Sequence, residues 1–343
     1  MKFGPVSPEN AVGKILGHNI AGPDGKRRLR KGTVLSAADV ALLQELGRTA
    51  VYVAELEPED VDENTAALRV AQAIMGEGLR LSGPATGRAN LLTTTAGVLR
   101  VDAERLTRLN ACVGITLATM LTNTAVRAGK LVATVKVLPF AVPETAVLTV
   151  EQIGRHPLPL IHVTPLQTRQ VTIILSGFPT ARTRIENSFL PPLRQRLEAL
   201  SATIQQIDFV PLEDTEDEIR LAQALQTHKQ LGADLIILAG ETAIMDEHDI
   251  APRAIRKAGG EVACFGAPVD PGNLLMLAYL KDVPVLGAPG CVRSPKINVV
   301  DWVLPRLLVG DRLTRADIYA LGHGGLLEDV PERPFPRQPT TNQ

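Results

Sequence analysis

The sequence contains few aromatic residues and no surplus of either charge. Only 3% of its residues are Phe, Trp or Tyr, and its formal net charge is −1 with a pI near 6.6. Proteins that bind single-stranded nucleic acid stack bases on aromatic rings, and nucleic acids and anionic membranes attract basic surfaces. The composition therefore argues against nucleic acid and membranes as partners, and it leaves small anionic ligands open.

Cysteine is also scarce. Cys112, Cys264 and Cys291 are odd in number, far apart and without a C-x-x-C pair, which is typical of reduced thiols in a cytosolic protein. The sequence shows neither the basic and apolar regions of a secretory signal nor a run of about 18 apolar residues that would span a bilayer. We therefore expect a cytoplasmic protein without disulfide bonds.

The length of 343 residues predicts more than one domain, because single hydrophobic cores stop growing near ~250–300 residues. From Arg169 onward, strand and helix patterns alternate regularly, which is typical of a parallel sheet. The proline-containing region Pro143–Pro165 is interpreted as the connection before it. We expect an α+β region over 1–165, an α/β domain over 166–312, and a C-terminal extension with a Pro-rich end over 313–343.

Two motifs in the first half are interpreted as ordinary structure. The basic run Lys26–Lys31 follows a turn and lacks interleaved aromatics, which favours a solvated loop over a phosphate contact. Thr86, Gly87, Arg88 and Asn90 could form an anion-binding turn, but Gly and Asn most often occur together because turns need positive φ. We prefer the plain turn.

A helix is predicted to begin after Ser36. Asp39 lies three residues further on, so the two side chains can satisfy two backbone amides reciprocally in a capping box. Val40 and Leu43 follow with helical spacing and predict its buried face.

Three short apolar runs in the second half each lead into a cluster of Gly, Asp and Pro. Asp234–Leu238 leads into AGETAIMDEHD, Glu261–Val269 ends in DPGN, and Pro284–Leu286 leads into GAPGCVRSP. Such runs are typical of buried strands, and loops at the carboxyl ends of parallel strands meet in the crevice where open α/β sheets bind ligands. The sequence therefore predicts a ligand site formed by these three loops.

The first of these loops is acidic. Glu241, Asp246, Glu247 and Asp249 place four acids after one strand, and gathered carboxylates can hold Mg²⁺ while water and a substrate phosphate complete its ligand shell. Asp249 is also the natural N-cap of the next helix, which is the ordinary structural reading. His248 has no partner His at the i, i+4 spacing of a helical zinc site, so it is interpreted as a solvated residue.

The other two loops suggest different roles. Asp270, Pro271, Gly272 and Asn273 are interpreted with equal weight as a tight turn and as a ligand contact. In the last loop, Ser294 and Pro295 are predicted to be the N-cap and first residue of a helix through Leu308. Gly and Pro before a helix start make an anion site, because free amides and the positive end of the helix dipole point toward it. Phosphate or a pterin-like ring would fit there.

These segments resemble the molybdenum-cofactor biosynthesis proteins that share the molybdopterin-binding domain, including the molybdopterin adenylyltransferase and molybdopterin molybdenumtransferase families. The resemblance is carried, in the family's order, by LIIL with AGETAIMDEHD, by IRKAGGEVACFGAPVDPGNLL, and by VPVLGAPGCVRSP, and it covers Val171–Val309. The segment KGTVLSAADVALLQELGRTAVYV, Lys31–Val53, also looks like the piece that precedes this domain in the molybdenumtransferases.

The resemblance implies a three-layer α/β sandwich with a mainly parallel sheet that binds the phosphate and pterin of molybdopterin. The family's loop acid falls on Asp249, or on Asp246 if the loop is aligned with one fewer residue, and these carboxylates are the implied catalytic and Mg²⁺-binding residues. The family's paired glycines appear here as Ala239 and Gly240, and its Pro-Gly-Asn-Pro turn as residues 289–292. The implied ligand contacts are Gly240, Glu241, Thr242, Asp270, Pro271, Gly272, Asn273, Pro289, Gly290 and Ser294.

The leading hypothesis is a molybdopterin-binding protein that assists metal insertion, with molybdate as a possible substrate, or nucleotide attachment. The alternatives are a hydrolase of nucleotide-containing cofactors, of the nicotinamide-nucleotide salvage type, and a non-catalytic carrier or scaffold for a molybdoenzyme. The altered glycine motif favours binding over catalysis. Expected partners are the pterin or nucleotide ligand, a second copy of the chain in a homo-oligomer, and a molybdoenzyme or cytidylyltransferase.

Overall fold

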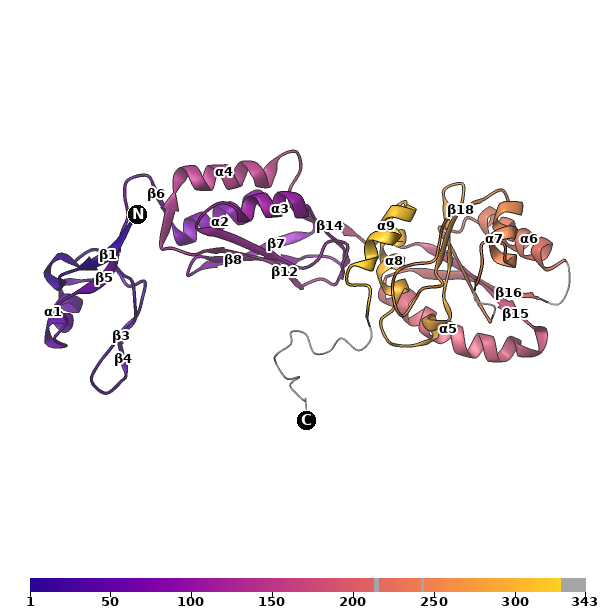
Figure 1. The fold of residues 1–343 in the computed structure, drawn as a ribbon, viewed down its shortest axis with the longest axis horizontal. Coiled ribbons are helices and arrows are strands. Elements are labelled where there is room, and N and C mark those ends of the chain that lie inside the picture. Colours follow the sequence, from indigo (N-terminus) through magenta and orange to yellow (C-terminus); the bar gives the residue numbers. More distant parts are fainter. Residues whose placement is uncertain (213–215, 242–243, 328–343) are drawn as a thin grey trace. The chain divides into compact units, whose positions relative to one another are not determined.

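The computed structural model describes residues 1–212, 216–241 and 244–327, and the chain divides into two compact units, Met1–Thr164 and Pro165–Gln343 (Figure 1). Each unit buries hydrophobic clusters of its own. Within the described ranges, no helix combines the length and the apolar character needed to cross a bilayer.

The first unit begins with a small antiparallel sheet in the order β1–β5–β2, and helix α1 packs on it. The Ser36 hydroxyl accepts a hydrogen bond from the Asp39 amide, and the Asp39 carboxylate accepts one from the Ser36 amide, which confirms the predicted capping box. Val40 and Leu43 are buried, as predicted. The elements are β1 Lys2–Val6, β2 Ile15–Leu16, β3 Ile20–Ala21, β4 Arg27–Leu29, α1 Ala37–Glu45 and β5 Val51–Glu55.

The rest of the first unit is built on a four-stranded antiparallel sheet in the order β10–β12–β8–β7. Helix α2 packs on this sheet through its alanine-rich face, and α4 packs against α2. The elements are β6 Asp60–Asp62, α2 Glu63–Ile74, β7 Leu79–Ala85, β8 Arg88–Thr93, β9 Gly97–Val101, α3 Ala103–Asn110, β10 Ile115–Thr119, β11 Ala125–Val126, β12 Leu131–Val137, β13 Ala141–Pro143, α4 Glu144–Arg155 and β14 Ile161–Pro165.

The interpretation of Pro143–Pro165 as a connection is wrong, because most of this region is α4 and β14. Its prolines lie outside the helix: Pro143 is the residue before its first turn, and Pro157 follows its end. Proline in these positions removes no intrahelical hydrogen bond. Arg69 on α2 binds both Glu144 and Glu151 on α4, with N–O distances of 2.7–3.1 Å, and so holds the two helices together.

The second unit contains a six-stranded sheet in the order β16–β15–β17–β20–β19–β18. The four adjacent strands β16, β15, β17 and β20 are parallel to one another. Strand β19 is antiparallel to both of its neighbours, β20 and β18. The elements are β15 Gln170–Gly177, α5 Arg182–Ala199, β16 Thr203–Pro211, α6 Asp217–Gln230, β17 Leu235–Gly240, α7 Ile250–Lys257, β18 Glu261–Phe265, β19 Met276–Leu280, β20 Val283–Gly287, α8 Val299–Leu308 and α9 Arg315–Tyr319.

Helices cover both faces of this sheet, which confirms the predicted three-layer α/β architecture (Figure 1). Side chains alternate between the faces of a strand, so Ile173 and Ile237 pack on one face with α5, α8 and α9. Ile174 and Ile236 point the other way and pack with α6 and α7. Because both faces are buried, the central strands are continuous apolar runs.

Two features of this unit were not predicted from the sequence. Strand β19 is one of them, and it joins β20 through the two residues Lys281 and Asp282, with Lys281 at a φ of 61°. Because β19 lies between β20 and β18, the loop that follows β18 begins two strands away from β20. In addition, α5 begins at Arg182, so Pro191 and Pro192 lie inside the helix.

Candidate functional site

A small cavity lies at the carboxyl ends of β15 and β17. Its volume is about 30 Å³, enough for one or two water molecules. Its polar lining comes from Ser176, Gly240 and Asp249, and Ala288 from the loop after β20 also contributes. The apolar lining is Leu212, Leu221, Leu238, Ala239, Ile244, Ile250 and Ala251. Two of the predicted site residues, Gly240 and Asp249, thus line one cavity.

Gly240 is required where β17 ends beside β15. A Cβ atom at this position would lie 2.1 Å from the carbonyl oxygen of Ser176 and 2.7 Å from its hydroxyl. The same carbonyl accepts a hydrogen bond of 3.2 Å from the Glu241 amide. Only glycine permits this approach of the two backbones, so the cavity wall requires glycine at position 240.

The acidic loop is largely bonded to itself. The Asp249 carboxylate accepts from the amide of Ile250 at 2.8 Å and from that of Met245 at 3.3 Å, and Asp249 is the N-cap of α7. The Asp246 carboxylate accepts from the His248 amide at 2.8 Å. The interpretation of Asp249 as the N-cap of the next helix is therefore confirmed. The carboxylates of Asp246 and Asp249 can each still accept further hydrogen bonds.

Other groups of this loop are placed less favourably for a cation. The Glu241 carboxylate forms an ion pair with Arg184 of α5. Thr242 lies outside the described residues. Among the residues that are described, no group of three or more Asp, Glu, His or Cys side chains is placed to hold a metal ion. Asp246 and Asp249 would thus need ligand phosphates and water to complete a Mg²⁺ shell, a common arrangement for this ion.

The DPGN segment connects β18 to β19 and is bonded to two other parts of the unit. The Pro271 carbonyl accepts the Val299 amide at 3.2 Å, and a Cβ atom on Gly272 would lie 2.3 Å from Val299 Cγ1. The Asp270 amide and carbonyl bond to Gly325 and Leu327, each at 2.8 Å. The segment therefore joins the start of α8 to the end of the described chain, and its role in ligand binding stays a prediction.

The loop after β20 forms a 3₁₀ turn, Gly290–Arg293, and Ser294 ends it. The Ser294 hydroxyl accepts the Lys296 amide at 3.1 Å instead of capping a helix. Pro289 precedes the turn and is buried. The prediction that Ser294 and Pro295 begin the following helix is wrong.

Helix α8 begins four residues later than predicted. Asn298 and Asp301 form its capping box, and Asn298 is fully buried. The amides of Val299 and Val300 bond to Pro271 and to the Asn298 side chain. The first amides of α8 are therefore already bonded within the protein, and they do not form the phosphate site predicted at Ser294.

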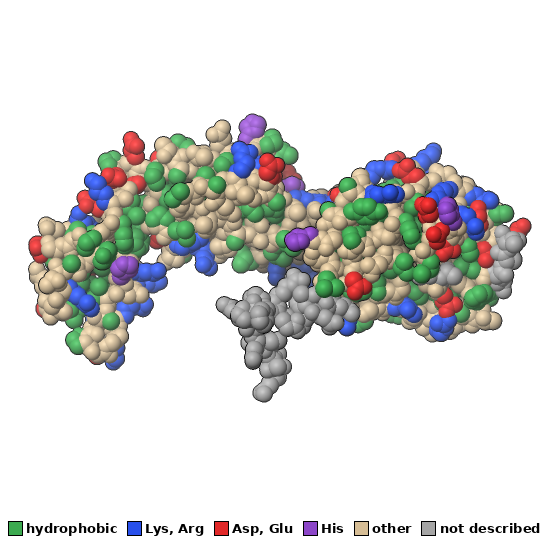
Figure 2. Space-filling view, in the orientation of Figure 1, with side chains coloured by type: hydrophobic (Ala, Val, Ile, Leu, Met, Phe, Trp, Pro, Cys, Tyr) green, Lys and Arg blue, Asp and Glu red, His purple; other side chains and the backbone are tan. Residues whose placement is uncertain are grey.

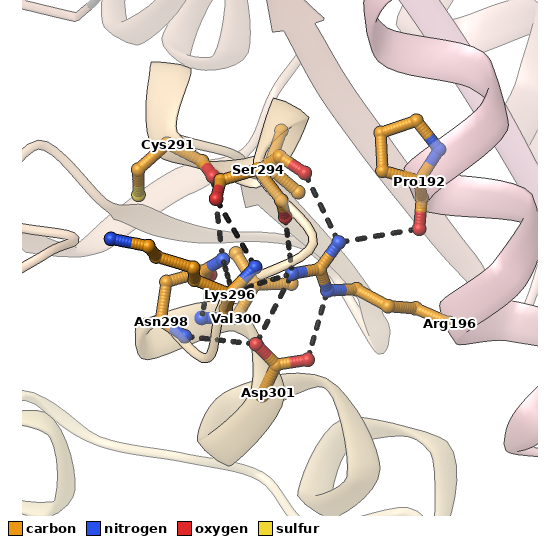
Figure 3. A network of polar contacts seen from close by, with 9 residues as sticks. Pro192, Arg196, Cys291, Ser294, Lys296, Asn298, Val300 and Asp301 are labelled. Atoms are coloured by element: carbon orange, nitrogen blue, oxygen red, sulfur yellow. Dashed lines mark hydrogen bonds and ion pairs between the residues drawn. The ribbon is translucent and has the colours of Figure 1, made fainter. Parts of the chain in front are cut away.

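Arg196 on α5, which was not predicted from the sequence, fixes this loop (Figure 3). Its guanidinium binds both carboxylate oxygens of Asp301, at 2.8 and 3.3 Å. It also donates to the carbonyls of Pro192, Val292, Ser294 and Lys296 at 3.0–3.3 Å. Its side chain is only 10% exposed. A signal was present: Arg196 is polar but shares helical spacing with the buried Phe189 and Leu193.

Cys291 lies in the 3₁₀ turn and is partly buried. Burial raises the pKa of its thiol, and the carboxylates of Asp270 and Asp301 add to that shift while Arg196 opposes it. The thiol is therefore neutral at physiological pH and is a poor nucleophile.

Comparison with known families identifies the second unit. A family described as "Probable molybdopterin binding domain" matches residues 172–308, which include β15 through α8 and all three loops. These residues form a domain of that family. The molybdopterin-binding domain thus contains the cavity, the acidic loop and the Arg196 network. A second family, described as "Domain of unknown function (DUF8806)", matches residues 5–55.

Three solved structures are similar to parts of the chain. A molybdenum cofactor biosynthesis protein from Pyrococcus furiosus shares 15% identity, covering 93% of this chain and 65% of its own, with a TM-score of 0.26. The molybdopterin biosynthesis enzyme MoaB from Thermus thermophilus shares 16%, covering 42% and 98%, with a TM-score of 0.30. The molybdopterin biosynthesis moeA protein from Pyrococcus horikoshii shares 12%, covering 90% and 74%, with a TM-score of 0.28.

The chain thus spans 65% of the length of the Pyrococcus furiosus protein. No curated protein matches the sequence.

Proposed function

We propose that the second unit binds molybdopterin at the carboxyl edge of its sheet, between the loops that follow β17 and β20. The observation that carries this proposal is that the family match contains a cavity lined by Gly240 and Asp249 at this edge. Open α/β sheets bind ligands outside the carboxyl ends of their strands. Ligand sites usually measure about 300–1,000 Å³, so the loops must separate to admit a pterin.

Each residue has a distinct role in this proposal. Gly240 allows the ligand to approach the end of β17, and the backbone of Pro289 and Gly290 contacts it from the loop after β20. Asp249, supported by Asp246, faces the phosphate. A bound Mg²⁺ would supply positive charge against the phosphate oxygens. Arg196 and Asn298 touch no ligand, and they position the loop after β20 through its carbonyls.

In the cell the protein would assist a step of cofactor assembly, either metal insertion from molybdate or nucleotide attachment. A homo-oligomer and a molybdoenzyme or cytidylyltransferase partner belong to this proposal. Purified protein is tested with adenylylated molybdopterin, with molybdopterin plus ATP, and with a dinucleotide. Conversion of either pterin substrate assigns the step, binding without conversion assigns a carrier, and hydrolysis of the dinucleotide alone contradicts the proposal.

Asp249→Asn is expected to reduce Mg²⁺-dependent binding of molybdopterin at least about tenfold, because it removes a carboxylate that would hold Mg²⁺ against the phosphate. Asn is nearly as good an N-cap as Asp, so the folding of α7 is retained. The affinity is measured by titration, from the pterin fluorescence, with Mg²⁺ and with EDTA. Without the pterin ligand, Mg²⁺ is expected to bind only weakly to either protein.

Glu247→Gln is the matched control, since it removes one exposed acid from the same loop. It should leave the affinity within about twofold. Equal Mg²⁺ dependence in the wild type and in Asp249→Asn would remove Asp249 from the proposed site.

A further inference from the structure

The first unit contains a groove of about 1210 Å³, in residues outside the molybdopterin-binding domain. Its walls come from the beginning of β1, the segment around Arg30, the start of α2, the β7–β8 turn and the end of β12 with the residues after it. The groove thus joins the two first-half motifs that were each interpreted as ordinary structure, the basic run ending at Lys31 and the turn at Thr86–Arg88.

The charge of this groove is strongly positive. Arg30, Lys31, Arg88 and Lys136 line it, and Glu63 is the one acidic residue in its lining. Lys136 pairs with Glu63 at 3.5 Å and donates to the Thr86 carbonyl at 2.6 Å. Residues 1–212 are described throughout, and in them Arg30, Lys31 and Arg88 are exposed and make no ion pair. Figure 2 shows Lys and Arg side chains and a histidine around a hollow on this part of the surface.

Three positive charges therefore remain uncompensated in one concave surface. Scattered surface cations need no explanation, but like charges gathered in a groove repel each other unless an anion binds between them. Charge-assisted hydrogen bonds from Arg and Lys are the usual means of binding phosphate. A ligand with several phosphate charges matches this groove better than one with a single charge.

Aromatic rings line the same groove. Phe3 and His18 are in the lining, with ring centroids 6.0 Å apart, and Tyr52 packs beside both at 6.0 and 5.5 Å. Phe3 is 49% exposed. In a sequence with 3% aromatic residues, an exposed ring beside unpaired cations offers a stacking surface for a planar base.

The turn that carries Arg88 is held rigidly in place. Thr86 and Gly87 have φ values of 49° and 67°, and the Gly87 amide donates to the Asn64 side chain at 2.9 Å. A Cβ atom on Gly87 would lie 2.4 Å from the Glu63 carboxylate. The glycine is thus required by both its backbone conformation and its contact with α2, and these contacts fix the backbone of the turn that precedes Arg88.

We propose that this groove binds a nucleoside polyphosphate, with its phosphates at Arg30, Lys31 and Arg88 and its base against Phe3. The site is separate from the molybdopterin site and does not depend on it. The test is isothermal titration of the full chain with ATP, adenosine and tripolyphosphate. ATP is expected to bind saturably, adenosine at least about tenfold more weakly, and added salt should weaken ATP binding.

Variants locate the binding. The double substitution Arg30→Gln and Lys31→Gln should weaken ATP binding at least about tenfold. The matched control is Lys26→Gln with Arg27→Gln, which removes two exposed charges of the same segment that do not line the groove. It should change the affinity less than about twofold. Phe3→Ala should weaken ATP but not tripolyphosphate.

Several results would overturn the proposal. They are the absence of saturable ATP binding, equal binding by the two double variants, and loss of ATP binding in Asp249→Asn with the groove variants unaffected. Displacement of ATP by a poly-glutamate peptide that binds more tightly would instead make the groove a site for an acidic protein segment.

Discussion

Arg196→Met is expected to lower the free energy of unfolding of the second unit by about 3 kcal/mol or more, because it removes one partner of a largely buried ion pair. Asp301 would lose its counter-charge, and the carbonyls of Val292, Ser294 and Lys296 would lose a donor. Trp302, the one tryptophan of the chain, lies in α8 next to Asp301. Its fluorescence during urea unfolding therefore reports on this unit.

Arg194→Met is the matched control, because Arg194 is exposed on the same helix. Its effect should stay within about 0.5 kcal/mol. An unfolding midpoint of Arg196→Met equal to that of Arg194→Met would show that the Arg196 network does not hold the loop after β20.

Gly240→Ala is expected to destabilise the same unit by about 1–3 kcal/mol or more and to abolish molybdopterin binding. The new methyl group would overlap the Ser176 carbonyl oxygen, which is backbone and cannot rotate away. The strands β15 and β17 would have to separate at the cavity. Urea unfolding followed by Trp302 fluorescence measures the stability, and pterin titration at a temperature where the variant is folded measures the binding.

Gly290→Ala provides the comparison on the neighbouring loop. The nearest atom to a Cβ on Gly290 is an Arg293 nitrogen at 3.6 Å, an ordinary contact. This variant should retain wild-type stability within about 0.5 kcal/mol. If Gly240→Ala were as stable as Gly290→Ala, the close approach of β15 and β17 would not be a constraint on the site.

Local patterns of the sequence predicted what depends on local chemistry. The capping box of Ser36 and Asp39 and the cap formed by Asp249 follow from side chains that bond to amides within a few residues. The apolar runs at β17 and β20 predicted buried strands, which the structure confirms. The family resemblance supplied the ligand, which no spacing of residues specifies.

Contacts between distant segments were not predictable in the same way. Ser294 followed by proline has the local pattern of a helix start. In the fold, however, Arg196, about 100 residues earlier in the chain, donates a hydrogen bond to the Ser294 carbonyl. Helix α8 begins only after its N-cap, Asn298. The basic run ending at Lys31 and the turn at Arg88 each have an ordinary local explanation. Only folding brings them to one groove.

Hydrogen–deuterium exchange of the full chain with and without molybdopterin tests the central claim most directly, because it shows where the ligand binds. The account predicts slower exchange of amides in residues 176–177, 239–241 and 288–291, at the carboxyl edge of the sheet in the second unit. Protection confined to residues 1–164, or no protection at saturating molybdopterin, would contradict it.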